Sequence, residues 1–151
     1  MSNTTTFRPV TSQDIDTIVS LMQDFYAIDS YPIDPEQSKL LFQTFISNEN
    51  LGKAWLIYHN NAIAGYVIVT FVFSFEYGGT IAFLDELYLT EKVRGKGIGK
   101  LAVQFIQTEA LKLKLKIIYL EVEEHNENAQ KLYLAQKFAV HHRKLMQYTV
   151  K

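Results

Sequence analysis

The chain has 151 residues, of which 48% are hydrophobic and 21% are charged, and these proportions exclude a disordered or fibrous protein. It contains no cysteine, so disulfides, thiolate metal sites and a cysteine nucleophile are excluded. The net charge of −1 argues against non-specific binding of nucleic acid. We expect a single domain that covers residues 1–151.

Charge is unevenly distributed along the chain. Residues 1–91 carry three basic and eleven acidic residues, whereas residues 92–116 carry seven basic residues and one acidic residue. The basic segment indicates a discrete anionic ligand, and the alternative is a solvated helix face. The sequence has no apolar stretch long enough to span a bilayer and no leader pattern at its start, so we expect a cytoplasmic protein with no membrane partner.

The first half of the chain predicts a strand, two helices and a hairpin. Residues 6–10 form a short strand, and the T-x-x-D pattern at Thr11 then begins a helix. Asp34 and Pro35 begin a second helix, because aspartate caps a helix start and proline is tolerated in the first turn. Residues 54–58 and 63–73 read as two strands joined by a turn at residues 59–61.

The second half predicts further strands that alternate with helices. We expect a strand at residues 81–89, a helix from Ile98, a buried strand at 117–122, a helix at 126–136 and two closing strands within 138–150. The element order is therefore β-α-α-β-β-β-α-β-α-β-β. It indicates an α+β (three-layer α/β) protein with a mixed, mostly antiparallel sheet.

The most informative segment is the glycine-rich turn between the strand at 81–89 and the helix from Ile98. Gly95, Gly97 and Gly99 allow successive backbone N–H groups to face one concavity, and the helix start adds its own unpaired N–H groups. Basic side chains surround this turn, which favours the binding of a diphosphate. The spacing matches neither a Walker loop nor the G-x-G-x-x-G dinucleotide pattern, so a nucleotide-binding module is disfavoured.

The turn does match the pattern Arg/Gln-x-x-Gly-x-Gly, here Arg94-x-x-Gly97-x-Gly99. This resembles the pyrophosphate-binding motif of the GNAT superfamily of acyl-CoA N-acyltransferases. The resemblance extends over residues 84–138, through the segments at 84–89 and 126–133. It implies a central sheet with helices on both faces and middle strands that splay apart. The family often has glycine where this chain has Lys137.

The resemblance also implies acetyl-CoA as cofactor. The lack of cysteines and of an H-x-x-x-H spacing argues against a metal. The strand residues at 87–89 would pair with the pantetheine arm through their backbone, with the Leu89 N–H facing the thioester carbonyl, and the glycine turn would hold the pyrophosphate. The implied cofactor-binding residues are Leu87, Tyr88, Leu89, Arg94, Gly95, Lys96, Gly97, Ile98, Gly99, Lys100, Asn126, Ala129 and Tyr133.

Acetyl transfer to an amine requires a base for the ammonium and favours an acid for the leaving thiolate. Glu86 is the candidate base, and the resemblance implies that Tyr133 is the acid. Strand alternation predicts that Asp85 faces away from Glu86. The alternatives are a solvated acid for Glu86 or Asp85 and a core residue for Tyr133. The candidate residues for binding the acceptor are Tyr26, Glu76, Tyr77, Asp85 and Glu86.

We therefore expect an N-acetyltransferase that moves an acetyl group from acetyl-CoA to a primary amine on a small cationic molecule. The stretch 84–99 also looks like that of diamine and polyamine acetyltransferases. One alternative is a non-catalytic sensor or regulatory domain that binds coenzyme A; another is an acetyltransferase for protein lysines or N-termini. The presence of both Glu86 and Tyr133 favours an enzyme. The resemblance also implies a possible homodimer, which is common in the family.

Overall fold

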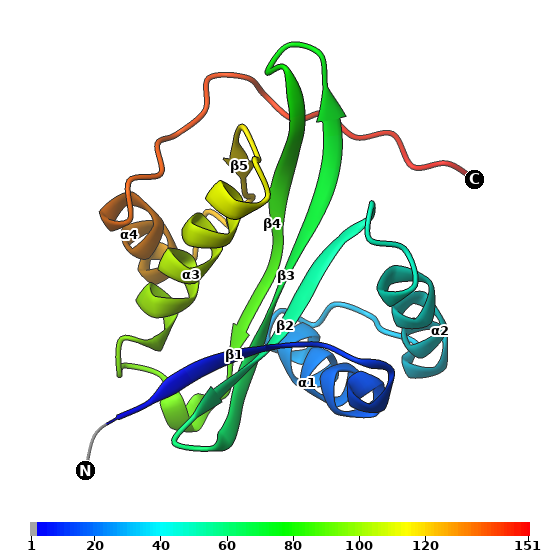
Figure 1. Ribbon diagram of the computed structural model, residues 1–151, viewed down its shortest axis with the longest axis vertical. Helices are drawn as coiled ribbons and strands as arrows, with labels where there is room; N and C mark the ends of the chain where they lie inside the picture. Colours follow the sequence, from blue (N-terminus) through cyan, green and yellow to red (C-terminus); the bar gives the residue numbers. More distant parts are fainter. Residues whose placement is uncertain (1–2) are drawn as a thin grey trace. The chain divides into compact units, whose positions relative to one another are not determined.

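The computed structural model describes residues 3–151 (Figure 1). The chain forms two compact units, one that extends to Glu121 and one that begins at Val122; each is described by itself. The first unit contains a five-stranded sheet in the order β1-β2-β3-β4-β5, in which every pair is antiparallel except β4 and β5. The strands are β1 (Thr5–Pro9), β2 (Gly52–His59), β3 (Ala62–Ser74), β4 (Gly79–Leu89) and β5 (Ile118–Tyr119).

Helices cover both faces of this sheet. One face carries α1 (Ile15–Ile28) and α2 (Pro35–Ile46), and the other carries α3 (Ile98–Lys112) (Figure 1). On the first face, apolar residues of both helices form one core with Leu56 and Tyr66. On the second face, Phe105 of α3 stacks on a phenylalanine of β1 and lies edge-on to Trp55. The mixed, mostly antiparallel fold class expected from the sequence is confirmed.

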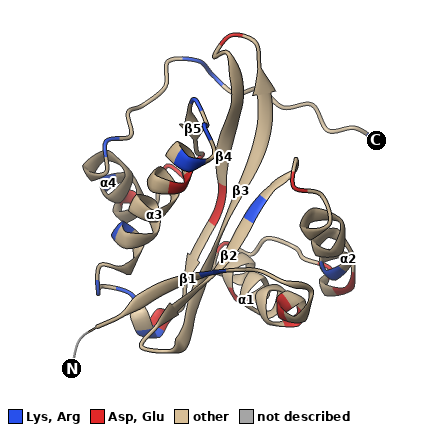
Figure 2. Cartoon of the chain, viewed as in Figure 1, with Lys and Arg blue, Asp and Glu red and all other residues tan. Residues whose placement is uncertain are grey.

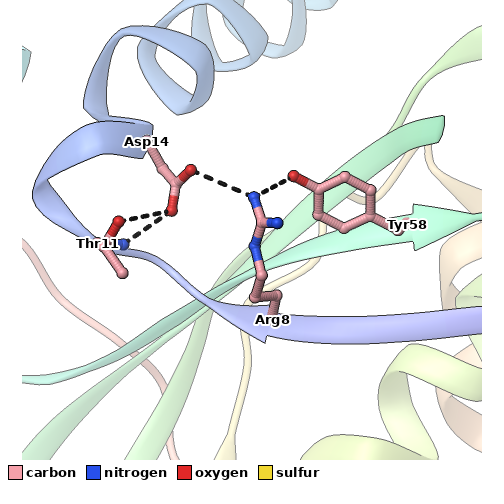
Figure 3. Close-up of polar contacts among 4 residues, drawn as sticks. All are labelled: Arg8, Thr11, Asp14 and Tyr58. Carbon is pink, nitrogen blue, oxygen red and sulfur yellow. Dashed lines mark hydrogen bonds and ion pairs between the residues drawn. The ribbon is translucent and has the colours of Figure 1, made fainter. Parts of the chain in front are cut away.

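A small polar cluster joins β1 to the start of α1 (Figure 3). The Thr11 backbone N–H donates to Asp14 Oδ2 over 2.9 Å, which places a short 3₁₀ turn, η1 (Ser12–Asp14), before α1. Arg8 donates to the Tyr58 hydroxyl and contacts Asp14 Oδ1 at 3.4 Å. The T-x-x-D pattern therefore marks the helix start as expected.

The other elements of the first half begin within two residues of the predicted positions. The Asp34 side chain accepts hydrogen bonds from the backbone N–H groups of Glu36 and Gln37 and so caps α2. Asn60 and Asn61 form the β2–β3 turn with positive φ angles of 51° and 65°. Gly65 lets β3 approach β4 closely, since a Cβ there would lie 1.9 Å from the Tyr88 carbonyl oxygen.

The C-terminal part of the sequence prediction needs correction. β5 has only two residues, against the six expected at 117–122, and no strand occurs within residues 138–150 of the described chain. Val140 and Tyr148 are 82% and 87% exposed. Strand-forming residues need a paired neighbour and a buried face to form a strand, and this segment buries neither of these side chains.

The second unit contains one helix, α4 (Glu127–Ala135), close to the predicted bounds. Asn126 caps it, because its Oδ1 accepts a hydrogen bond from the Ala129 N–H over 3.1 Å. No helix within residues 3–151 combines the length and the apolar character that a membrane span requires.

Candidate active site

A β-bulge in β4 determines how its two acidic residues are presented. Ile68 of β3 pairs with Glu86, whereas the next residue, Val69, pairs with Leu84, so that Asp85 is the extra residue. A bulge interrupts the regular alternation of side chains along a strand. Asp85 and Glu86 consequently line the same cavity. The expectation that Asp85 faces away from Glu86 is therefore wrong, because it assumed an unbroken strand.

Glu86 is held by two phenols. Tyr26 of α1 donates to Glu86 Oε2 over 2.6 Å, and Tyr66 of β3 donates to Oε1 over 2.7 Å. Burial raises the pKa of the Glu86 carboxyl above its ordinary value, and the nearby Asp85 adds to this rise. The two hydrogen bonds oppose it, because they stabilise the charged form. The Glu86 carboxylate is thus held in a fixed position, and its pKa lies above that of an ordinary glutamate.

The phenols themselves stay protonated. Burial, followed by the interaction with Glu86, raises the pKa of both Tyr26 and Tyr66 above that of a free tyrosine. Each therefore keeps its proton as a hydrogen-bond donor to the carboxylate at neutral pH. Asp85 is the more exposed of the two acids, and partial desolvation raises the pKa of its carboxyl as well.

The cavity above Glu86 has a volume of about 460 Å³ and is bounded by α1, α2, β3 and β4. This lies within the range of small-molecule sites in proteins, ~300–1,000 Å³. Asp85 and Glu86 line it from β4, Thr70 from β3, and Phe42 and Phe45 from α2. The lining contains no lysine, arginine or histidine. The arrangement suits a small cationic molecule.

The structure brings only part of the predicted acceptor site together. Tyr26, Asp85 and Glu86 line the cavity, whereas Glu76 and Tyr77 do not. Those two residues belong to the β3–β4 turn, where the Tyr77 hydroxyl accepts a hydrogen bond from the Tyr119 hydroxyl over 2.6 Å. The aromatic and acidic composition of residues 1–91 does not reveal which of these residues lie in the cavity and which lie in the β3–β4 turn.

Beyond Phe83, no strand among the described residues pairs with the edge of β4 that faces β5, which is called the open edge here. β4 and β5 pair only at Ala82–Ile118 and Phe83–Tyr119. On the other edge, the Thr90 N–H donates to the Ala64 carbonyl over 2.8 Å. Because backbone groups alternate along a strand, the N–H groups of Leu87 and Leu89 point toward the open edge. Tyr88 instead directs its carbonyl toward β3.

The glycine turn follows directly from this open edge. After the 3₁₀ turn η2 (Glu91–Val93), Gly95 and Gly97 adopt φ angles of 78° and 79°, in the left-handed region that glycine permits. α3 begins at Ile98, whose side chain is buried, so only its backbone N–H can contribute to binding. Figure 2 shows basic residues along the segment between β4 and α3 and an acidic band midway along β4.

Three cations surround the turn. Arg94 Nε donates to the Leu89 carbonyl oxygen over 3.1 Å, and its guanidinium lies 5.8 Å from the centre of the Tyr88 ring. Lys96 and Lys100 are exposed beside it. Apart from its chain neighbours, no described atom lies within 4 Å of the position that a Cβ would occupy on Gly95 or Gly97. The turn therefore offers open space lined by backbone N–H groups and positive charge, the features that bind a diphosphate.

A model of the acetyltransferase (GNAT) family matches residues 16–138. The chain belongs to this family. The matched region contains β2 to β4, the glycine turn, α3 and α4. Members of the family bind acetyl-CoA. The open edge of β4 suits its pantetheine arm, which can pair like a strand, and the glycine turn suits its diphosphate.

Individual relatives agree with this assignment. A D-amino-acid N-acetyltransferase of Saccharomyces cerevisiae is 32% identical over 53 residues, which are 35% of this chain and 33% of the yeast protein. The alignment thus spans about a third of the length of that curated relative. An integron cassette protein from the mobile metagenome of Cole Harbour Salt Marsh is 26% identical, covers 96% of this chain and 90% of its own, and has a TM-score of 0.86.

A third relative shares the fold at low sequence identity. The crystal structure of a predicted acetyltransferase with acetyl-CoA from Clostridium acetobutylicum is 17% identical, with a TM-score of 0.80 and 96% coverage of both chains. Across residues 3–151, no group of three or more His, Cys, Asp or Glu side chains is arranged to hold a metal ion.

The predicted contacts in the second unit stay predictions. Within that unit, Asn126 and Ala129 form the cap of α4, and the Tyr133 ring packs edge-on against Phe138 at a centroid distance of 5.7 Å. Burial raises the pKa of the Tyr133 phenol, so it carries its proton at neutral pH.

Tyr66 is a site residue that was not predicted from the sequence. It is fully buried in β3, and its hydroxyl donates to Glu86. A signal was available, since a tyrosine that is buried in a largely apolar strand needs a partner for its hydroxyl. The identity of that partner depends on the register between β3 and β4, which the sequence does not reveal.

Proposed function

We propose that this protein is an acetyl-CoA-dependent N-acetyltransferase that acts on a primary amine of a small cationic molecule. The observation that carries the proposal is the position of Glu86. It lies at the base of a cavity without basic residues, held by two phenols, on the strand whose open edge runs into the glycine turn. Family membership and the fold of its relatives support an acyltransferase that uses acetyl-CoA.

The proposed cofactor site uses the backbone of β4 and of the turn after it. Acetyl-CoA would supply an activated acetyl group as a thioester. The Leu87 and Leu89 N–H groups at the open edge would hold the pantetheine arm, with the Leu89 N–H toward the thioester carbonyl. Backbone N–H groups at Gly95–Gly99, together with Arg94, Lys96 and Lys100, would bind the pyrophosphate.

The proposed base is Glu86. An ammonium with an ordinary pKa of ~10.4 reaches the site protonated and must lose a proton before it can attack. Each carboxylate oxygen has two acceptor positions, so the two phenols leave Glu86 the capacity to accept a further proton donor. Its raised pKa strengthens it as a base. Asp85, in the same cavity, would attract the cation.

The proposed acid is Tyr133. A proton donor to the leaving thiolate must be protonated at neutral pH, and the burial of Tyr133 favours that state. Asn126 and Ala129 would contact the pantetheine, as the resemblance to the family implies. We also propose that the two units work as a single domain.

The direct test is to incubate the purified protein with acetyl-CoA and a panel of primary amines and to follow thiol release. An acetyltransferase releases coenzyme A at a rate that depends on the amine. A protein that binds coenzyme A without amine-dependent thiol release would instead be the sensor domain. A strong preference for peptides over small amines would indicate an acetyltransferase for protein lysines or N-termini.

A further inference from the structure

One carboxylate that lines the cavity above Glu86, that of Asp85, has no ion-pair partner among the described residues. Three carboxylates line it, from Asp34, Asp85 and Glu86. Asp34 accepts two backbone hydrogen bonds at the start of α2, over 3.1 and 3.2 Å. Both oxygens of Glu86 accept from phenols. Within the described chain, Asp85 forms no ion pair.

No cation of the protein neutralises Asp85 from the cavity wall. Lys39 is the basic residue of α2, and it pairs with Asp16 at 3.3 Å and with Glu36 at 3.4 Å, outside the lining. A bound cation is therefore favoured beside Asp85. A ligand that brings its own carboxylate meets two acidic side chains on β4 and no basic partner.

Part of the cavity wall that α2 forms is apolar. Phe42 and Phe45 of α2 lie edge to face at a centroid distance of 6.4 Å, and Met22 of α1 and Ile68 of β3 also line the cavity. Leu41 stands at the rim and is 61% exposed. An apolar group placed against these side chains would itself be removed from water, which favours binding.

We propose that the acceptor is a primary amine with one cationic centre and an apolar body, of the arylalkylamine or alkylamine class. Its ammonium lies beside Asp85 and Glu86, and its body lies against Phe42, Phe45 and Leu41. This inference rests on the proposed function and narrows it. It disfavours polyamines, because the apolar wall formed by α2 offers no free anion to a second ammonium. It also disfavours amino acids, because no cation lines the cavity to pair with their carboxylate.

Three probes of similar size separate these classes. 2-Phenylethylamine has the proposed chemistry, D-phenylalanine adds a carboxylate, and 1,6-diaminohexane replaces the apolar end with a second ammonium. We expect kcat/KM for 2-phenylethylamine to exceed that for each of the other two by at least about tenfold, which corresponds to one favourable polar or apolar contact. Equal or faster turnover of D-phenylalanine or of the diamine would overturn the inference while leaving acetyl transfer intact.

A matched pair of variants tests the location. Leu41 and Leu40 are neighbours on α2 with similar exposures of 61% and 64%, but only Leu41 lines the cavity. Leu41→Glu should reduce the preference for 2-phenylethylamine over the diamine by about tenfold, whereas Leu40→Glu should leave it within about twofold. A similar change of this preference in both variants, or in neither, would contradict the assignment of the α2 wall to the apolar body of the acceptor.

Binding separates this inference from the proposed function. If no amine causes thiol release, the proposed function fails, and calorimetric titration with 2-phenylethylamine then decides the inference. Saturable binding that Leu41→Glu weakens and Leu40→Glu does not would support it. Absence of binding to the wild-type protein would overturn it.

Discussion

At the scale of single residues, the pKa of Glu86 is set by opposing contacts. Burial and Asp85 raise it, while Tyr26 and Tyr66 lower it by donating to the carboxylate. A base needs a pKa high enough to take a proton and low enough to be ionised at working pH. The two phenols therefore do more than orient the side chain, because they also limit how far burial raises its pKa.

Replacing Glu86 with glutamine tests its role as the base. Glu86→Gln keeps the size of the side chain but cannot accept the ammonium proton, so turnover at neutral pH should fall by about a hundredfold. The loss should shrink at high pH, where solvent supplies free amine. Steady-state rates of thiol release across pH would measure this, with exposed Glu49→Gln as a control that leaves the rates unchanged. Full activity of Glu86→Gln at neutral pH would remove Glu86 from the mechanism.

Loss of the Tyr66 hydroxyl should change the pH dependence of the reaction. Tyr66→Phe removes a hydrogen bond that stabilises the Glu86 carboxylate, so the pKa of Glu86 should rise. As the pH is lowered, the variant should therefore lose activity at a higher pH than the wild-type protein does, because the reaction requires ionised Glu86. Tyr58→Phe is the matched control, since the Tyr58 hydroxyl contacts Arg8 and not Glu86. An unshifted acidic limb of kcat/KM in Tyr66→Phe would make Tyr66 a packing residue alone.

Tyr133→Phe separates proton donation from packing. The variant should bind coenzyme A with nearly wild-type affinity but turn over about a hundredfold more slowly, because the leaving thiolate loses its proton donor. Calorimetry gives the affinity and thiol release gives the rate. If binding collapses while the bound fraction turns over normally, Tyr133 serves only to pack.

At the scale of elements, β4 combines two local irregularities, the bulge at Asp85 and the glycine turn at its end. The glycine turn was predictable because glycine, basic residues and a helix start leave a pattern in the sequence. The bulge was not, since nothing local to Asp85 distinguishes a regular strand from one with an extra residue. Its position follows from the pairing of Ile68 with Glu86 and of Val69 with Leu84. This is why the sequence prediction placed Asp85 on the wrong side of β4.

The glycine turn can be tested with a matched pair of glycines. Gly97 and Gly78 have φ angles of 79° and 78°, and at both positions an added Cβ would have no atom within 4 Å. Alanine at either position should lower the free energy of unfolding by about 1 kcal/mol, because a Cβ disfavours this backbone region. Gly97→Ala alone should also weaken coenzyme A binding, since the turn would no longer hold its N–H groups toward the diphosphate. Equal affinities of the two variants would contradict the assignment of the turn.

At the scale of the whole molecule, the sequence predicted the elements up to α3 and the helix α4 within a few residues. These elements depend on local signals, such as the cap at Asp34 and the turn at Asn60 and Asn61. The predicted strands within 138–150 did not form, because strand pairing depends on distant partners. The cavity likewise needs α1, α2, β3 and β4 together, so Phe42 and Phe45 could not be assigned to it from the sequence.

Acetyl-CoA is proposed to bind, through its diphosphate, to β4 and the turn that follows it. Calorimetric titration of the wild-type protein with coenzyme A and with pantetheine, which lacks the diphosphate and the phosphoadenosine attached to it, tests this most directly. We expect coenzyme A to bind at least about a hundredfold more tightly, because several charge-assisted hydrogen bonds are lost with the phosphates. Equal affinity for the two ligands, or no heat with coenzyme A, would contradict the account.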